Sequence, residues 1–576
     1  MPAHRSLFCS LAMLALVCHL SAAEPAWTGY RGPEGTGVFP GCNPPIDCDM
    51  ATGRNIRWRT PLPNWGHGCP MIAKDRAYVL SEPGWKHDWP VLTCIDIGTG
   101  KVLWEREINH LPATGLSAER QTEVAKQWHD FQAEWRTLFT IFAETVGQGD
   151  QEAAKRRFAE RKYKFEGHYG GGYGQLRSLG GRPMLRLKDA GLRSDVWRHD
   201  CGMGYDEIGA AYATPVSDSE HVYVVASRSA LASFDREGKQ RWLTYLPFPP
   251  ELGGYNETNG RSPILYRDLV ITDHPGYTVA VEKATGKIRW QAKTFGGGIA
   301  TPAIITVGGT DVLLTEGHQG KGGGLHALRL PDGKPLTLAA ATDAVKEKTQ
   351  EDVPPGVSVP KIGGWGLAGL VIAVDTDHRD VAFFSSGIHS DFQGKKIPDN
   401  PDLPLWTDLP VAVRFTLDGE TLKSTVLWDA NTHLNKLRGT SVISMVYHRD
   451  RLYLGNAVVE ALTGKIVTSG KNLLPTTRHL HLIANDRIYG LSGHAGMCDR
   501  PPEAGKPVAT LTCMDLNGKV LGTSNLTMAP VDDAKREQIR SQVGWDRWGF
   551  GYGMPFTIAG DCLYLRSSDE LICVGK

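Results

Sequence analysis

The sequence of 576 residues lacks a net charge, a second long hydrophobic run and a dense set of cysteines. It contains 63 basic and 63 acidic side chains, so its charge gives no reason to expect a nucleic acid or an anionic membrane surface as a partner. Beyond the first 23 residues, no stretch holds the ~20 apolar residues that a membrane helix needs. The 11 cysteines include no adjacent pair and no Cys-x-x-Cys-His motif for haem attachment.

Residues 1–23 have the pattern of a secretory signal. His4 and Arg5 precede the apolar segment LFCSLAMLALVCHL, and small residues lead to Ala23, after which we expect cleavage. Val17 stands where a lipid-attachment motif at Cys18 needs a small residue, so the sequence does not favour a lipid anchor. The mature chain is therefore expected to be soluble, periplasmic or secreted, and without a transmembrane segment.

Nine cysteines remain after cleavage, and export permits disulfides. Cys94, Cys513 and Cys573 occupy matching places in the strand-like runs LTCIDI, LTCMDL and LICVGK, which indicates small buried hydrophobic residues. The candidate disulfide pairs are Cys42 with Cys48, and Cys498 with Cys513.

A strand, a glycine turn and a further short strand recur along the chain, at spacings of 45–54 residues with two longer gaps. Two more strand candidates precede each turn, so a unit has about four short strands, which is the size of a propeller blade. We therefore predict an all-β, eight-bladed, quinoprotein-like β-propeller. The turn glycines are Gly53, Gly100, Gly238, Gly286, Gly333, Gly419, Gly464 and Gly518.

The first and last units are incomplete in complementary ways. The last unit ends without its turn and outer strand, whereas TGRNIRW at 52–58 is a turn and outer strand without a unit. We predict that this N-terminal strand completes the last blade, which joins the two ends of the ring and removes two exposed sheet edges. The predicted organisation is a signal peptide at 1–23, an N-terminal extension at 24–50 and the propeller at 51–576.

Residues 108–200 are predicted to form an α-helical hairpin inserted in the propeller. A helix beginning near Ser117 is followed by a second helix at 150–164. The first helix carries an apolar stripe with steps of three and four residues, which favours core packing over a partner surface. The stripe consists of Val124, Trp128, Phe131, Trp135, Leu138 and Phe142.

The strand–TGK–Trp repeat resembles the pyrroloquinoline-quinone-like (PQQ-like) repeat of quinoprotein β-propellers. WTGYRGPEGTG at 27–37 and NWGHGCPMIAKDRAYVLS at 64–81 are similar to a family of exported bacterial PQQ-binding-like propeller proteins. The resemblance covers nearly the whole mature chain apart from the insertions. It implies eight blades around a central channel, on a fold whose members include dehydrogenases and assembly scaffolds.

Two features of this sequence depart from the functions that the resemblance implies. The dehydrogenases hold PQQ with Ca²⁺ between a tryptophan and two adjacent cysteines, and this sequence has no such cysteine pair. The scaffold relative is a lipoprotein that helps to assemble outer-membrane barrels, whereas here the lipid motif is poor and a helical insertion is present.

Residues directly before the innermost strands are expected to meet at one mouth of the channel. Arginine forks suit carboxylate, sulfate or phosphate oxygens, and the oxygens of Glu207 and Asn259 are candidates for Ca²⁺. The alternative is that charged pairs in the channel only satisfy one another. The candidate ligand-binding residues are His67, Glu207, Asn259, Arg261, Arg438, Arg478, His479 and Trp548.

The sequence thus favours a ligand-binding or protein-interaction scaffold in the cell envelope, with a degenerate quinone site. The expected partner is an unidentified protein, a small anionic ligand or a glycan. A PQQ- and Ca²⁺-dependent alcohol or sugar oxidoreductase is one alternative, and acidic-polysaccharide binding is another. Whether the protein is an enzyme stays open, and no catalytic residue is assigned.

Overall fold

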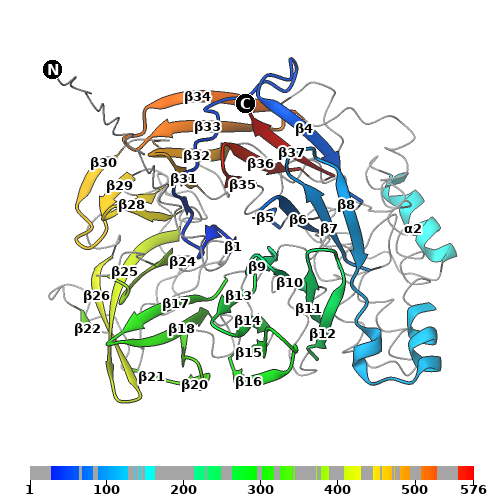
Figure 1. The fold of residues 1–576 in the computed structure, drawn as a ribbon, viewed down its shortest axis with the longest axis horizontal. Helices are drawn as coiled ribbons and strands as arrows, with labels where there is room; N and C mark the ends of the chain where they lie inside the picture. Colours follow the sequence, from blue (N-terminus) through cyan, green and yellow to red (C-terminus); the bar gives the residue numbers. More distant parts are fainter. Residues whose placement is uncertain are drawn as a thin grey trace, which may run out of the picture.

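Eight β-sheets of four to six strands are arranged around a common axis as the blades of a propeller (Figure 1). In each blade, antiparallel strands run from an innermost strand at the axis to an outermost strand at the rim. The predicted all-β, eight-bladed fold is confirmed. This computed structural model describes residues 28–63, 66, 68–81, 89–126, 137, 141, 144–145, 150–161, 213–226, 230–247, 262–274, 276–294, 301–316, 325–339, 342–343, 371–372, 378–387, 408–429, 445–454, 457–469, 473, 481–492, 507–527, 556–567 and 569–576.

Blades 1 to 4 follow one another in chain order. Blade 1 contains β5 (Met71–Ala73), β6 (Arg76–Ser81), β7 (Val91–Asp96) and β8 (Val102–Glu107). Blade 2 contains β9 (Val216–Ser217), β10 (His221–Ala226), β11 (Ala230–Asp235) and β12 (Gln240–Tyr245). Blade 3 contains β13 (Ile264–Tyr266), β14 (Leu269–His274), β15 (Tyr277–Glu282) and β16 (Ile288–Lys293). Blade 4 contains β17 (Ala303–Val307), β18 (Thr310–Glu316), β19 (Leu325–Arg329) and β20 (Lys334–Pro335).

Blades 5 to 8 complete the ring. Blade 5 contains β23 (Val371–Ile372), β24 (Val381–Gly387), β25 (Asp408–Asp418) and β26 (Thr421–Asp429). Blade 6 contains β27 (Val446–His448), β28 (Arg451–Leu454), β29 (Ala457–Glu460) and β30 (Ile466–Ser469). Blade 7 contains β31 (Leu482–Ala484), β32 (Arg487–Ser492), β33 (Ala509–Asp515) and β34 (Val520–Leu526). Blade 8 contains β35 (Phe556–Ala559), β36 (Cys562–Arg566), β37 (Glu570–Gly575) and β4 (Ile56–Pro61).

Blade 8 takes its outer strand from the N-terminal part of the chain, as predicted. Strand β4 pairs antiparallel with β37, so that Trp58 lies opposite Cys573. The guanidinium of Arg59 also donates two hydrogen bonds to the carboxylate of Glu570. The two ends of the described chain are therefore joined in one sheet, and the ring has no open seam there.

All eight predicted turn glycines adopt a left-handed backbone, with φ between 59° and 87°. In five blade interfaces, a tryptophan from the outer strand of one blade lies over a turn of the next blade. Each indole donates from Nε1 to a backbone carbonyl oxygen at 2.7–2.9 Å. The tryptophan–glycine pairs are Trp58–Gly100, Trp104–Gly238, Trp242–Gly286, Trp290–Gly333 and Trp428–Gly464.

The other three interfaces replace the indole with different contacts. Leu473 lies over Gly518 between blades 6 and 7. Between blades 7 and 8, the N-terminal extension approaches the outer strand at Gly522, where a Cβ atom would lie 2.5 Å from the carbonyl oxygen of Ile46. Between blades 4 and 5, β21 (Thr337–Leu338) and β22 (Thr342–Asp343) pair in parallel with β26.

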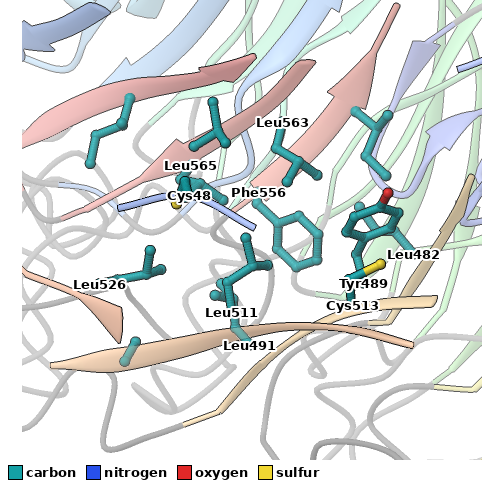
Figure 2. Close-up of a cluster of buried hydrophobic side chains, with 14 of the residues drawn as sticks. Cys48, Leu482, Tyr489, Leu491, Leu511, Cys513, Leu526, Phe556, Leu563 and Leu565 are labelled. Carbon is teal, nitrogen blue, oxygen red and sulfur yellow. The ribbon is translucent and has the colours of Figure 1, made fainter. Parts of the chain in front are cut away.

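The hydrophobic core lies between neighbouring blades. Eight clusters of buried apolar residues each contain side chains from two adjacent blades. Figure 2 shows one of them, in which Leu563 and Leu565 of blade 8 face Leu491 and Leu511 of blade 7, with Phe556 among them. Since the core is distributed around the ring, each blade depends on both neighbours for its burial.

The insertion after blade 1 is helical where the structure describes it. It contains η1 (Leu111–Thr114), helical residues 118–126 and α2 (Gln151–Glu160), which lies at the outside of the ring (Figure 1). Val124 of the predicted stripe is buried, as are Ala154 and Phe158 of α2. The other five stripe residues lie outside the described residues. No helix of the described residues is long and apolar enough to span a membrane.

We predict that Gly286→Ala destabilises the protein more than Gly53→Ala. Both glycines have a φ that an L-residue adopts at a cost of about 1–2 kcal/mol. Only at Gly286 would the new methyl group meet an indole, since its Cβ would lie 2.6 Å from the ring of Trp242, whereas nothing lies within 4 Å at Gly53. Overpacking adds about 1–3 kcal/mol, so thermal unfolding should show a clearly lower Tm for Gly286→Ala. Equal Tm values would refute the role of the tryptophan–glycine contact.

Candidate functional site at the propeller axis

The predicted mouth residues all belong to connections that the structure does not describe. His67, Glu207, Asn259, Arg261, Arg438, Arg478, His479 and Trp548 lie outside the described residues. Their convergence at one mouth therefore stays a prediction. The polysaccharide-binding role, which depends on the three arginines among them, stays a prediction as well. The described residues at the axis form the base of the site.

The N-terminal extension enters the axis of the propeller. Strands β1 (Thr28–Gly29) and β2 (Gly32–Pro33) form a hairpin whose first strand pairs with β9 of blade 2. Strand β3 (Val38–Phe39) then pairs in parallel with β31 of blade 7. In Figure 1, β1 lies near the middle of the ring, viewed along the axis. The sequence resemblance at residues 27–37 gave no sign of this position.

The extension enters from the end of the propeller that carries the glycine turns. After β3, Asn43 donates from its backbone N–H to the carbonyl oxygen of Gly560, in the first turn of blade 8. The side chain of Asn43 also accepts hydrogen bonds from Asn485 and Arg487 at the first turn of blade 7. The chain's own segment thus closes this end of the axis.

Residues 31–37 form a compact loop that reaches toward the opposite end of the axis. Its backbone closes through a 2.8 Å hydrogen bond from the N–H of Gly37 to the carbonyl oxygen of Arg31. The ring of Phe39 covers Gly32, where a Cβ atom would lie 2.2 Å away. Arg31 has a φ of 64°, which is unusual for a residue with a side chain.

Arg31 is buried at the level where the innermost strands begin. Its side chain is 2% exposed, and Nη2 donates to the carbonyl oxygen of Met445, directly before β27. Burial lowers the pKa of Arg31 to about 10, which still leaves the guanidinium charged at neutral pH. Burial also raises the pKa of the adjacent Tyr30 to about 12, so its phenol keeps its proton. The loop therefore places one positive charge at the axis.

A belt of hydrogen bonds joins the starts of the innermost strands of blades 1 to 4. The N–H of Cys69 donates to Thr214 Oγ1 at 3.2 Å, the N–H of Thr214 to Ser262 Oγ at 2.9 Å, and the N–H of Ser262 to Thr301 Oγ1 at 3.3 Å. Each of these residues precedes a proline, which favours an extended backbone at that point. The recurring Ser-Pro and Thr-Pro pairs were visible in the sequence but did not by themselves indicate a belt.

Two buried charged side chains form hydrogen bonds that reach a neighbouring blade. The carboxylate of Asp273 accepts hydrogen bonds from Thr278 and Thr315, which joins blades 3 and 4. Arg566 donates to the carbonyl oxygen of Gly68 and to Ser81. Within the described residues, no group of three His, Cys, Asp or Glu side chains is arranged to hold a metal ion. These partners are neutral hydroxyl and carbonyl groups, so the alternative that charged pairs in the channel satisfy one another stays a prediction.

The cysteines do not form the predicted disulfides. Cys42, Cys48 and Cys513 are free thiols, which contradicts both candidate pairs. Cys48 lies in the cluster between blades 7 and 8, and its N–H donates a hydrogen bond to Ser524 Oγ. Cys42 directly precedes Asn43, whose N–H donates to the carbonyl oxygen of Gly560. The two cysteines are therefore held at different points. The expectation that Cys94, Cys513 and Cys573 are buried is confirmed.

Cys562 and Cys573 form a thiol pair on neighbouring strands of blade 8. The hydrogen bond from Cys573 lowers the pKa of the Cys562 thiol below its usual range, and Arg57 Nη1, 3.5 Å from the sulfur, lowers it further. The same bond raises the pKa of Cys573. Cys562 is thus the thiol of this pair that ionises first.

We predict that Cys562 is the first of the buried cysteines in the described residues to react with a small alkylating reagent near neutral pH. The thiolate is the nucleophile, and an ordinary thiol becomes ionised only near pH 8.5. Burial raises the pKa of Cys513 to about 11 and that of Cys94 to about 12, so both should stay unmodified. Mass spectrometry of iodoacetamide-treated protein between pH 6 and 9 measures this, with Cys562→Ser as the control. Modification of Cys513 before Cys562 would contradict it.

Comparison with known proteins gives a family match and distant structural likenesses. A PQQ-repeat family model described as outer membrane protein assembly factor BamB matches residues 46–130 and 189–301. No curated protein matches. Among solved structures, BamB from Moraxella catarrhalis has a TM-score of 0.33 at 12% identity, covering 62% of this chain and 80% of the other. A europium-containing methanol dehydrogenase has a TM-score of 0.33 at 13% identity, covering 92% of this chain and 87% of the other.

The family match and the sheet topology agree in indicating a propeller built from repeated four-stranded units. The two structural likenesses have TM-scores too low to add to this, so the fold rests on the eight antiparallel sheets themselves. The chain is an eight-bladed β-propeller, and two of its segments match the PQQ-repeat family model. Its matched segments cover the closing strand, blade 1 and blades 2 and 3.

Proposed function

We propose that the protein is an exported PQQ-like propeller that acts as a ligand-binding or protein-interaction scaffold in the cell envelope. The observation that carries the proposal is the difference between the two ends of the axis. One end has short turns and is closed by residues 28–43, which contact blades 1, 2, 6, 7 and 8. At the other end, the outer strand of each blade ends and the innermost strand of the next blade begins.

Long connections on a rigid framework are the usual place for binding. The connection from β26 to β27 spans 430–445, and that from β34 to β35 spans 527–555. The predicted mouth residues Arg438 and Trp548 belong to these two connections. The match to an assembly factor supports the scaffold class, and the signal at 1–23 supports a periplasmic or secreted location.

A photo-crosslinking amino acid at position 438 should capture a discrete partner in intact cells. The same amino acid at position 52, in an exposed turn at the closed end, should give no matching product. Crosslinked bands are detected by immunoblot and identified by mass spectrometry. Products from position 52 alone, or the same products from both positions, would contradict a partner site at the open end.

The described residues do not fit a PQQ–Ca²⁺ site. The chain has no adjacent cysteines to stack on the quinone, and the described residues offer no set of metal ligands. The dehydrogenase alternative therefore depends on Glu207 and Asn259 as proposed Ca²⁺ ligands. It also depends on Trp548 as the proposed ring that faces the quinone.

Calorimetric titration of the mature protein with PQQ, with and without Ca²⁺, separates the two functions. A scaffold with a degenerate quinone site should show no stoichiometric binding and no rise in Tm. Tight, Ca²⁺-dependent binding near one PQQ per chain, lost in Glu207→Gln, would replace the scaffold proposal with the oxidoreductase. A quinoprotein dehydrogenase of known PQQ affinity serves as the positive control.

A further inference from the structure

Arg31 differs from the other buried arginines in how its guanidinium is satisfied. Arg566, which is 1% exposed, donates to a backbone carbonyl and a serine hydroxyl. Arg31 is as deeply buried, but only Nη2 has a partner, the carbonyl oxygen of Met445. Nε and Nη1 of Arg31 have no hydrogen-bond partner among the described residues. None of the ion pairs in that part of the chain includes Arg31.

Burying the guanidinium of Arg31 with only one hydrogen bond to the described residues costs free energy of folding. The backbone of the loop at residues 31–37 fixes its position. Burying a charge without a pairing group is among the most unfavourable arrangements in a protein. The left-handed φ of 64° would suit glycine, yet an arginine occupies the position. Gly37 lies beside the guanidinium, since a Cβ atom there would be at the ordinary contact distance of 3.5–3.6 Å from Nη2 and Nε. A left-handed backbone and a guanidinium that lacks a charged partner among the described residues, both at one position, point to a functional constraint.

The geometry of the guanidinium defines what it can bind. It has five N–H groups in a planar fork, and Nη2 uses one of its two on Met445. One edge of the fork therefore still offers two parallel N–H groups, which match the two oxygens of a carboxylate or of a tetrahedral oxyanion. The protonated Tyr30 phenol next to it adds no negative charge.

We propose that Arg31 is the base of a binding site for a small oxyanion at the propeller axis, with the anion bound through the free edge of the guanidinium. The site lies at the level of the hydrogen-bonded belt, on the side of the N-terminal segment that faces the open end. The anion supplies the negative charge that the described residues do not place beside Arg31. This inference goes beyond the scaffold proposal, because it holds whether or not a protein partner binds.

The test uses trifluoroacetate as a probe and follows its ¹⁹F line width in the presence of the full-length mature protein. Wild-type protein should broaden the line, and acetate, phosphate or sulfate should reverse the broadening, whereas chloride at equal ionic strength should not. Arg31→Met keeps the bulk of the side chain and removes the charge, so affinity should fall about tenfold or more. Arg54→Met removes an exposed arginine and should behave as the wild type.

Competition assigns the source of the anion. Reversal by acetate alone identifies a carboxylate site, and reversal by phosphate or sulfate alone identifies a site for tetrahedral anions, and each result supports the proposal. Broadening that is equal in wild type, Arg31→Met and Arg54→Met would overturn it, because binding would then be unrelated to Arg31. No broadening by the wild type would also overturn it.

A measurement on the wild type alone guards against a variant that fails to fold. Wild-type crystals soaked in selenate should show an anomalous selenium peak within hydrogen-bond distance of the Arg31 guanidinium. Ordered water without anomalous signal at that position would mean that solvent satisfies the arginine, and the anion site would be abandoned. The partner-crosslinking experiment at position 438 is unaffected by this result, so the two proposals can fail separately.

Discussion

The contact between a tryptophan of one blade and a turn glycine of the next is the interaction on which the ring depends. The turn needs a left-handed residue, and the indole needs a position without a Cβ atom, so one glycine satisfies both constraints. The indole N–H also reaches a carbonyl oxygen of the neighbouring blade. Because Trp58 makes this contact from β4, the closing strand attaches blade 8 to blade 1 in the same way as other blades are attached.

The interfaces without a tryptophan show how the same position is filled by other means. Leu473 takes the place of the indole over Gly518, and the backbone of Ile46 approaches Gly522 on the outer strand of blade 7. The N-terminal extension is thus part of the wall between blades 7 and 8 before β4 begins. A chain that lost residues 43–49 would lose these contacts while keeping every strand of the ring.

Sequence patterns predicted the features that repeat and missed those that occur once. The eight glycine turns recur with a short strand directly after each of them, so eight copies could be aligned and the closure by β4 inferred. The path of residues 28–39 through the axis depends on pairing with strands some 190 and 440 residues away, such as Thr28 with Ser217 and Val38 with Ile483, which no local pattern encodes. The disulfide predictions failed because spacing in sequence says nothing of how strands and loops hold Cys48 and Cys513. For the predicted mouth, the sequence identified which connections between blades carry the candidate residues. The described structure contains the innermost strands at which these connections end.

The N-terminal segment gives the two ends of the propeller different roles. Any group bound at the axis must share it with residues 28–39, whose loop carries Arg31 to the level where the innermost strands begin. A flat cofactor spanning the axis would have to lie beyond this loop, with a guanidinium beneath it. An oxyanion needs only one edge of that guanidinium. The segment at one end of the axis thus determines which group of the protein a bound molecule would meet first, the guanidinium of Arg31.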